Sequence, residues 1–157
     1  MAAVPDHQFN ELNPPPEGDE EPLPEQFSED SLACIWVKRH ARDWRYVAQW
    51  DRWYRWAGDR WEEERKKAPI ELARIITRQV LMMPGLTPAA RLRVNSAKTA
   101  YALLTFVRSD PLIAAVPEQF DTNPHLLGVP DGQIDLTQCK YVEAQREAYI
   151  TKQCSVA

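Results

Sequence analysis

The sequence predicts an α+β fold: a mainly helical domain with a small Trp-rich antiparallel β-meander and short C-terminal strands. Two observations carry this prediction. Apolar residues recur at helical spacing in three segments, 29–42, 70–83 and 87–108. Between the first two segments, residues 45–64 form short aromatic runs separated by turn residues, and such runs are typical of paired strands.

Charge and proline content divide the chain into two parts. Residues 1–26 carry seven acidic side chains and six prolines, with no lysine or arginine. A segment of this kind cannot bury enough apolar surface to offset the entropy of ordering. We therefore expect a disordered, acidic, Pro-rich leader over 1–26 and one folded domain over 27–157. The net charge of −4 then hides a basic middle between Lys38 and Arg108.

Helix signals begin directly after the leader. Ser28 is a candidate N-cap, acidic residues follow it, and basic residues stand near the end of the segment, as a helix dipole favours. Leu32, Ile35 and Trp36 supply an apolar stripe. The first helix is expected over about 29–42.

The meander holds most of the tryptophan. Three strands are expected, over 45–50, 52–57 and 60–64, with turns at Asp51 and at Gly58-Asp59. Alternation places Tyr54 and Trp56 on one face and Trp53 on the other. Since each indole removes on the order of 200 Å² from water, we expect Trp50, Trp56 and Trp61 in the core. Trp53 is then expected on an exposed face.

Two further helices are predicted after the meander. The segment 70–83 is closed by Pro84-Gly85. Thr87 and Pro88 then supply an N-cap and a first-turn proline for one long helix to about Arg108. Its inward side chains are expected to be Leu92, Leu103, Leu104 and Val107, and its polar face is expected to hold Arg91, Asn95 and Lys98.

The C-terminal part is predicted to contain a loop, a turn and short strands. Pro130-Asp131-Gly132 is turn chemistry, and residues 133–136 alternate as a strand does. Asp131 and Asp135 could be taken for a catalytic carboxylate pair. We favour the turn and the strand, because Pro-Asp-Gly explains Asp131 without any chemistry.

The sequence lacks the residue patterns that several classes of protein require. The five glycines form neither a phosphate-binding loop nor a dinucleotide-binding turn, so we expect no catalytic residue, no ATPase activity and no cofactor. We expect no metal site and no disulfide framework, because the histidines and cysteines are scattered. They are His7, His40 and His125, and Cys34, Cys139 and Cys154. No signal peptide or membrane-length apolar run is present, so a cytoplasmic protein without membrane partners is expected.

The interleaved tryptophans and arginines of the meander have two interpretations, and the sequence leaves both open. They are either a compact hairpin core or a surface on which bases stack while guanidinium groups hold phosphates. Basic residues on the predicted helix faces extend the second interpretation. The candidate DNA-binding residues are Arg42, Arg45, Arg52, Trp53, Arg55, Arg74, Arg78, Arg91 and Lys98.

A series of motifs in fixed order makes the chain recognisable. The series is Phe27-Ser28-Glu29-Asp30, Trp53-Tyr54-Arg55-Trp56-Ala57-Gly58-Asp59, Phe120-Asp121-Thr122-Asn123-Pro124, Pro130-Asp131-Gly132 and Tyr149-Ile150-Thr151-Lys152. It resembles the domain that precedes the superfamily 3 helicase in phage, plasmid and poxvirus-type primase-helicases. The resemblance covers about 27–157. One departure is Gly128, where that family usually places Asn.

The resemblance implies a non-catalytic module in the DNA replication of a mobile element. Its expected partners are a helicase domain or further copies of the chain, and single-stranded or forked DNA. In that family an ATP-binding helicase domain follows the Ile-Thr-Lys motif, whereas this chain stops at Ala157. The sequence therefore also leaves open a stand-alone, phage-encoded inhibitor or decoy that acts by protein contact.

Overall fold

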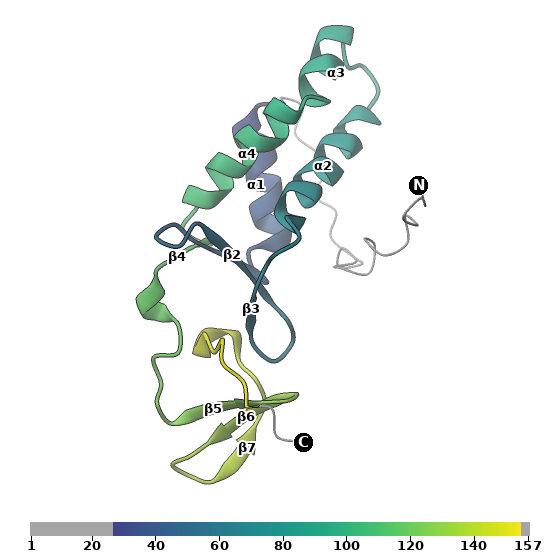
Figure 1. Cartoon of the computed structure of the whole chain (residues 1–157). Coiled ribbons are helices and arrows are strands. Elements are labelled where there is room, and N and C mark those ends of the chain that lie inside the picture. Colours follow the sequence, from purple (N-terminus) through teal and green to yellow (C-terminus); the bar gives the residue numbers. More distant parts are fainter. Residues whose placement is uncertain (1–26, 155–157) are drawn as a thin grey trace, which may run out of the picture.

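A computed structural model describes residues 27–154, and the predicted leader, 1–26, lies outside the described residues. Within residues 27–154, four α-helices lie at one end, a four-stranded sheet lies in the middle, and a three-stranded sheet lies at the other end (Figure 1). The predicted α+β class is thus confirmed.

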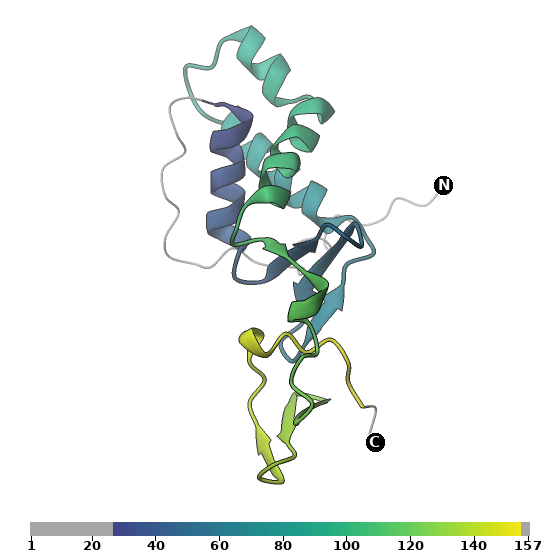
Figure 2. The same cartoon turned by 90° about the vertical axis from the view of Figure 1, so that its left-hand side faces the viewer.

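Three of the helices pack on one another in pairs (Figure 2). They are α1 (Glu29–His40), α2 (Ala68–Leu81) and α4 (Ala97–Ser109). Helix α1 begins at the predicted cap, where Ser28 and Ser31 each accept a hydrogen bond from the other's backbone N–H. The buried stripes of the helices, which include Leu32, Ile76 and Leu103, meet in one apolar core.

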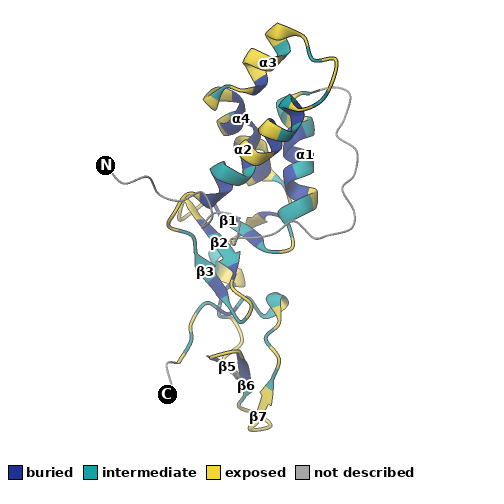
Figure 3. Cartoon of the chain, turned by 90° about the vertical axis from the view of Figure 1, so that its right-hand side faces the viewer, coloured by how far each residue is buried: buried dark blue, intermediate teal, exposed yellow. Residues whose placement is uncertain are grey.

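The predicted long helix over 87–108 is wrong, because the structure divides it. Helix α3 (Pro88–Val94) stops before Asn95, and α4 starts anew with Ser96 as its N-cap. The Ser96 hydroxyl accepts a hydrogen bond from the Thr99 backbone N–H at 3.1 Å, which gives the backbone an alternative to a continuous helix. Because α3 turns away, Leu92 is 78% exposed rather than inward. Figure 3 shows α3 largely exposed at the tip.

The central sheet has the strand order β3-β2-β1-β4. Its members are β1 (Trp44–Val47), β2 (Arg52–Trp56), β3 (Trp61–Glu63) and β4 (Ala114–Ala115). The first three strands form the predicted antiparallel meander, and β4 adds a short parallel pairing to β1. Asp51 and Gly58 adopt positive φ values of 51° and 105° in the two turns of the meander.

Both faces of the central sheet are covered. Trp53 points toward the helices and packs on Trp36, with ring centroids 5.6 Å apart. Tyr54 and Trp56 face the other way and contribute to a second cluster with Trp61. The opposite orientation of Trp53 is therefore confirmed, but its predicted exposure is wrong, since only 8% of it is exposed.

The prediction for Trp50 is also wrong. This tryptophan lies in the turn between β1 and β2 rather than in a strand, and 42% of it is exposed. Its ring leans on Tyr54 and Phe120 at centroid distances of 5.9 and 6.0 Å. The turn begins at Val47, whose carbonyl accepts the Trp50 N–H, so the second half of the predicted first strand, 48–50, does not pair.

The C-terminal lobe contains the second sheet, in the order β5-β6-β7. Its strands are β5 (Leu126–Val129), β6 (Gly132–Asp135) and β7 (Lys140–Val142), with the predicted Pro-Asp-Gly turn between β5 and β6. Two 3-10 helices, η3 (Pro117–Gln119) and η4 (Arg146–Ala148), flank this sheet in the sequence.

Gly128 has a clear steric role in this lobe. It lies within β5, not in a turn, and it also pairs in parallel with Gln153 of the C-terminal segment. The Cys154 N–H donates to the Gly128 carbonyl at 2.9 Å. A Cβ at Gly128 would collide with the Lys152 carbonyl oxygen. Glycine at this position therefore permits close approach of two backbones.

Candidate nucleic-acid interface

The arginines of the meander mostly take part in internal contacts. The Arg45 guanidinium lies over the Trp61 ring at 4.9 Å and donates from Nε to the Tyr149 hydroxyl at 2.9 Å. It also donates to the backbone carbonyl of Trp44 at 2.7 Å. Arg45 is thus a tie between the central sheet and the C-terminal segment, and its cation–π contact adds to that role.

Carboxylates balance the other basic groups of the meander. Arg52 forms an ion pair with Glu63 at 2.6 Å, and Arg60 contacts both Asp59 and Glu62. Arg55 lies directly opposite Glu62 in the sheet register. Residues 45–67 contain seven basic and five acidic side chains, so the net charge of this part is only +2.

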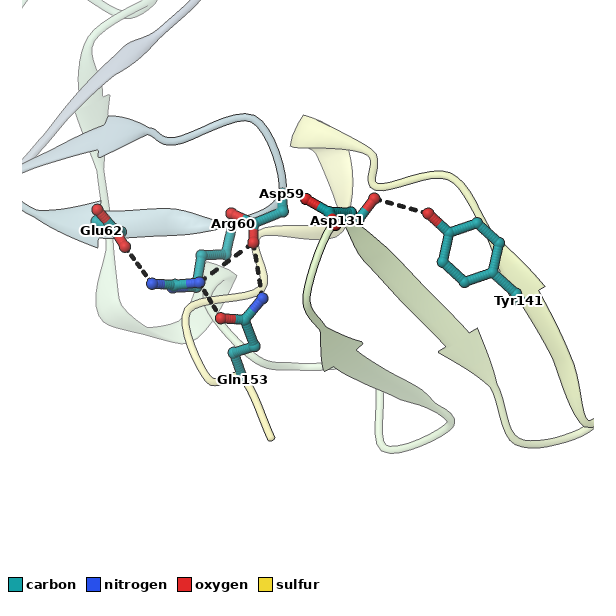
Figure 4. A network of polar contacts seen from close by, with 6 residues as sticks. All are labelled: Asp59, Arg60, Glu62, Asp131, Tyr141 and Gln153. Atoms are coloured by element: carbon teal, nitrogen blue, oxygen red, sulfur yellow. Dashed lines mark hydrogen bonds and ion pairs between the residues drawn. The ribbon is translucent and has the colours of Figure 1, made fainter. Parts of the chain in front are cut away.

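Figure 4 shows how the second turn of the meander is joined to the C-terminal segment. The Gln153 amide accepts from Arg60 and donates to the Asp59 carboxylate, the latter at 2.7 Å. Beyond it, the Tyr141 hydroxyl donates to the backbone carbonyl of Asp131 at 2.7 Å. The contacts of Gln153 join the central sheet to the C-terminal segment, which pairs with β5 at Gly128. The Tyr141 hydrogen bond lies within the second sheet, and Asp131 lies in the turn that its motif predicts.

The burial of the tryptophans decides between the two interpretations of the meander, a hairpin core or a surface on which bases stack. Of the six, only Trp50 has a substantially exposed ring. Trp53, a candidate for stacking on bases, is buried between Trp36 and Trp44. The aromatic meander is therefore principally a hairpin core, and in this conformation Trp53 presents no free face to a base.

Unbalanced positive charge lies instead on the later helices. Residues 68–109, which form α2, α3 and α4, contain six basic side chains and one acidic side chain, a net charge of +5. The acidic residue is Glu71. The following residues, 110–157, carry three basic and seven acidic side chains, a net charge of −4. Positive charge is therefore concentrated on α2–α4 and negative charge in the C-terminal part of the chain. Figure 1 shows that these helices and the second sheet lie at opposite ends of the molecule.

A groove of about 460 Å³ lies between α2 and α4. Arg74 and Arg78 enter it from α2, and the start of α4 and Tyr101 form the opposite wall. Both arginines are held by Glu71, whose Oε1 accepts from Arg78 at 2.9 Å and whose Oε2 accepts from Arg74. Tyr101 is 60% exposed. The groove thus combines two oriented guanidinium groups with an accessible aromatic ring.

The remaining candidates lie apart from this groove or at its margin. Lys98 is exposed on α4, three residues before Tyr101, and therefore lies on the same helix face. Arg91 donates to the Leu81 carbonyl at 2.9 Å near the far end of the lobe. Arg42 lies beside Arg45 in a separate shallow pocket.

Tyr101 is the residue that the sequence reasoning missed. The apolar and basic positions of the predicted helix over 87–108 do not single it out. The signal was present, since an aromatic residue three positions after Lys98 shares a face with it. Recognising that the face was exposed required the correct start of α4.

Two ionisable side chains of the described residues, His40 and Asp135, have pKa values lowered by their surroundings. Burial, aided by the neighbouring charge of Arg39, lowers the pKa of His40 to about 4, so this imidazole is neutral at pH 7. Hydrogen bonds from Thr137 lower the pKa of Asp135, which caps the turn after β6. No group of three potential metal-ligating side chains occurs among residues 27–154.

The three cysteines, Cys34, Cys139 and Cys154, are free and exposed. Within residues 27–154, every helix is too short or too polar to cross a membrane.

The fold and the site define an α+β module in which polar side chains cap helices, pair charges and join two sheets. A family model described as "D5 N terminal like" matches residues 33–157. The chain therefore belongs to the family of N-terminal domains of D5-like primase-helicases, which are non-catalytic modules of DNA replication proteins. The resemblance seen in the ordered motifs is confirmed. No curated protein matches the chain at a significant level.

Proposed function

We propose that this chain is a replication module of a mobile element that holds single-stranded or forked DNA on its helical end and helps a superfamily 3 helicase to assemble. Its protein partner would be the helicase domain or a second copy of the chain, and it would act in the cytoplasm. Membership of the primase-helicase family supports the role in DNA replication. The charge of α2–α4 supports the DNA contact.

That charge distribution is the observation that carries the proposal. In the meander, ion pairs and near-equal numbers of acids and bases cancel most of the field. Residues 68–109, which form α2–α4, carry six basic side chains and only one acidic side chain. A polyanion gains affinity where cations replace its counterions, and that gain depends on net rather than gross charge. The helical end is therefore the favoured surface for DNA.

Fluorescence anisotropy with a labelled single strand and a labelled fork tests this proposal. We expect weak, sequence-independent binding that falls steeply with salt. Reversing two charges, Arg91→Glu with Lys98→Glu, should lower the affinity and flatten the dependence on salt. The matched control, Lys140→Glu with Lys152→Glu, makes the same change of net charge in the acidic lobe and should have little effect.

The acidic leader offers a second arm of the same experiment. Its seven carboxylates add negative charge to the chain, so deletion of residues 1–26 should strengthen binding at low salt. Equal effects of the two double reversals would show that only total charge matters, and would remove the argument for the helical end.

The alternative is an inhibitor or decoy that acts by protein contact. Exposed apolar side chains at the α2–α3 end favour it, since Met82 and Leu92 are 86% and 78% exposed. Absence of saturable binding to strand and fork at low salt would make this the preferred function.

A further inference from the structure

We propose that the groove between α2 and α4 binds one unpaired nucleotide of single-stranded DNA, with a phosphate held by Arg74 and Arg78 and the base stacked on Tyr101. This inference rests on the proposed function and assigns a site to it. It draws on three observations: the arginine pair, the carboxylate that holds the pair, and the unoccupied tyrosine face.

The arginine pair is placed by the helix itself. Arg74 and Arg78 are four residues apart on α2, so they lie on one face with a rise of about 6 Å between them. Both side chains are about half exposed at the groove. A guanidinium has five N–H donors, and the contacts to Glu71 leave several on each arginine for an incoming anion.

Glu71 shows that this pair is suited to an oxyanion. Its two carboxylate oxygens each bind one guanidinium. Phosphate offers the same planar donors a similar set of acceptor oxygens. With Glu71 in place the cluster keeps a net charge of +1, which a phosphate would neutralise. The carboxylate therefore orients the arginines and also competes with the ligand.

Tyr101 provides the surface for a base. Its ring is exposed on the wall of the groove, and no aromatic ring or cation stacks on it within the described part of the chain. Because every base has a π-face, such a ring binds without reading sequence. A paired base has its faces covered by its neighbours, so this arrangement favours single-stranded over duplex DNA.

The size of the groove agrees with this occupant. Its volume of about 460 Å³ falls in the usual range for ligand clefts. Lys98 lies one turn before Tyr101 on the exposed face of α4. A strand leaving the groove along α4 would therefore meet a further cation.

The test compares two probes on the full chain: a labelled thymidine homopolymer of about 16 nucleotides and an abasic strand of the same length. Tyr101→Ala should weaken binding to the homopolymer by roughly 5- to 100-fold and leave binding to the abasic strand unchanged. Tyr101→Phe keeps the ring and should restore the affinity.

The phosphate contact has its own variants. Arg74→Gln with Arg78→Gln should weaken binding to both strands and, because one phosphate contact is lost, reduce the magnitude of the slope of log affinity against log salt by about 0.7. Glu71→Gln should strengthen binding to both strands several-fold at low salt, because it removes the competing carboxylate. Unfolding cannot produce such a gain, so this variant tests the site even if the others lose stability.

The two levels of the hypothesis fail differently. Absence of binding by the unmodified chain would overturn the proposed function. If the unmodified chain binds, equal effects of Tyr101→Ala on the two strands would overturn the assignment of the groove as the nucleotide site. Unchanged affinity in Glu71→Gln would do so as well. In either of the last two cases the DNA contact would lie elsewhere on the helical end.

Discussion

Asp121 and Thr151, thirty residues apart, are joined by two hydrogen bonds. The Thr151 backbone N–H donates to Oδ1 at 2.8 Å, and its hydroxyl donates to Oδ2 at 2.5 Å. Asp121 also donates its own N–H to the Tyr149 carbonyl at 3.1 Å. Both residues belong to the recognised motifs. The two motifs therefore contact each other and join the segment that follows the central sheet to the C-terminal segment.

Asp121→Ala should therefore destabilise the protein by about 1–3 kcal/mol, because it leaves the Thr151 donors without their acceptor. Asp121 also has a positive φ of 52°, which Asp and Asn tolerate better than Ala. Asp121→Asn should recover part of the loss. Urea denaturation measures both variants, and equal losses would show that the carbonyl of the side chain plays no part.

The tryptophans make a second prediction. Trp53→Ala should cost about 3–5 kcal/mol, as much as Trp56→Ala or Trp61→Ala, because all three rings are buried. Trp50→Ala should cost far less, because its ring is 42% exposed. Denaturant midpoints of the four variants provide the comparison. A mild effect of Trp53→Ala would contradict the burial of that ring under the helices.

His40 makes stability depend on pH. Its pKa is about 4 in the folded protein and 6.5 when unperturbed, so the unfolded chain binds the proton more readily. The contribution of neutral His40 is complete above pH 6.5 and is lost as the pH falls from 6.5 to 4. The loss should amount to about 3 kcal/mol.

The variant His40→Gln isolates this effect, since glutamine does not titrate in that range. We expect the difference in unfolding free energy between the native protein and His40→Gln to change with pH between 6.5 and 4. Carboxylates titrate in both proteins and largely cancel in the difference. A difference that is independent of pH would mean that His40 has the same pKa in the folded and unfolded states.

Gly128 offers a test confined to the C-terminal lobe. Gly128→Asn should push the C-terminal segment away from β5, because a Cβ there meets the Lys152 carbonyl. The hydrogen bond from Cys154 N–H to Gly128 should then open, and this amide should exchange faster with solvent. The Leu32 amide in α1 serves as the internal control. Unchanged exchange at Cys154 would show that the backbone accommodates the side chain.

The sequence by itself determined the fold class, the first helix, the meander and the family. Helix caps, turns and apolar spacing are local signals, and they act within a few residues of one another. The cap at Ser28, the meander turns and the strand after Asp131 were predictable for this reason. Asn95-Ser96 is an ambiguous local signal, because Ser96 can either stay within a helix or start a new one.

Only the tertiary structure decided which faces are covered and which charges are balanced. Alternation placed Trp53 opposite Trp56, but it could not show that helices cover one face while Phe120 and Tyr149 cover the other. In the same way, composition predicted a basic region in the middle of the chain, but it could not show which of these charges form ion pairs. Burial and electrostatic balance depend on residues that are distant in the chain, and for that reason the candidate interface moved from the tryptophan hairpin to Arg74, Arg78 and Tyr101.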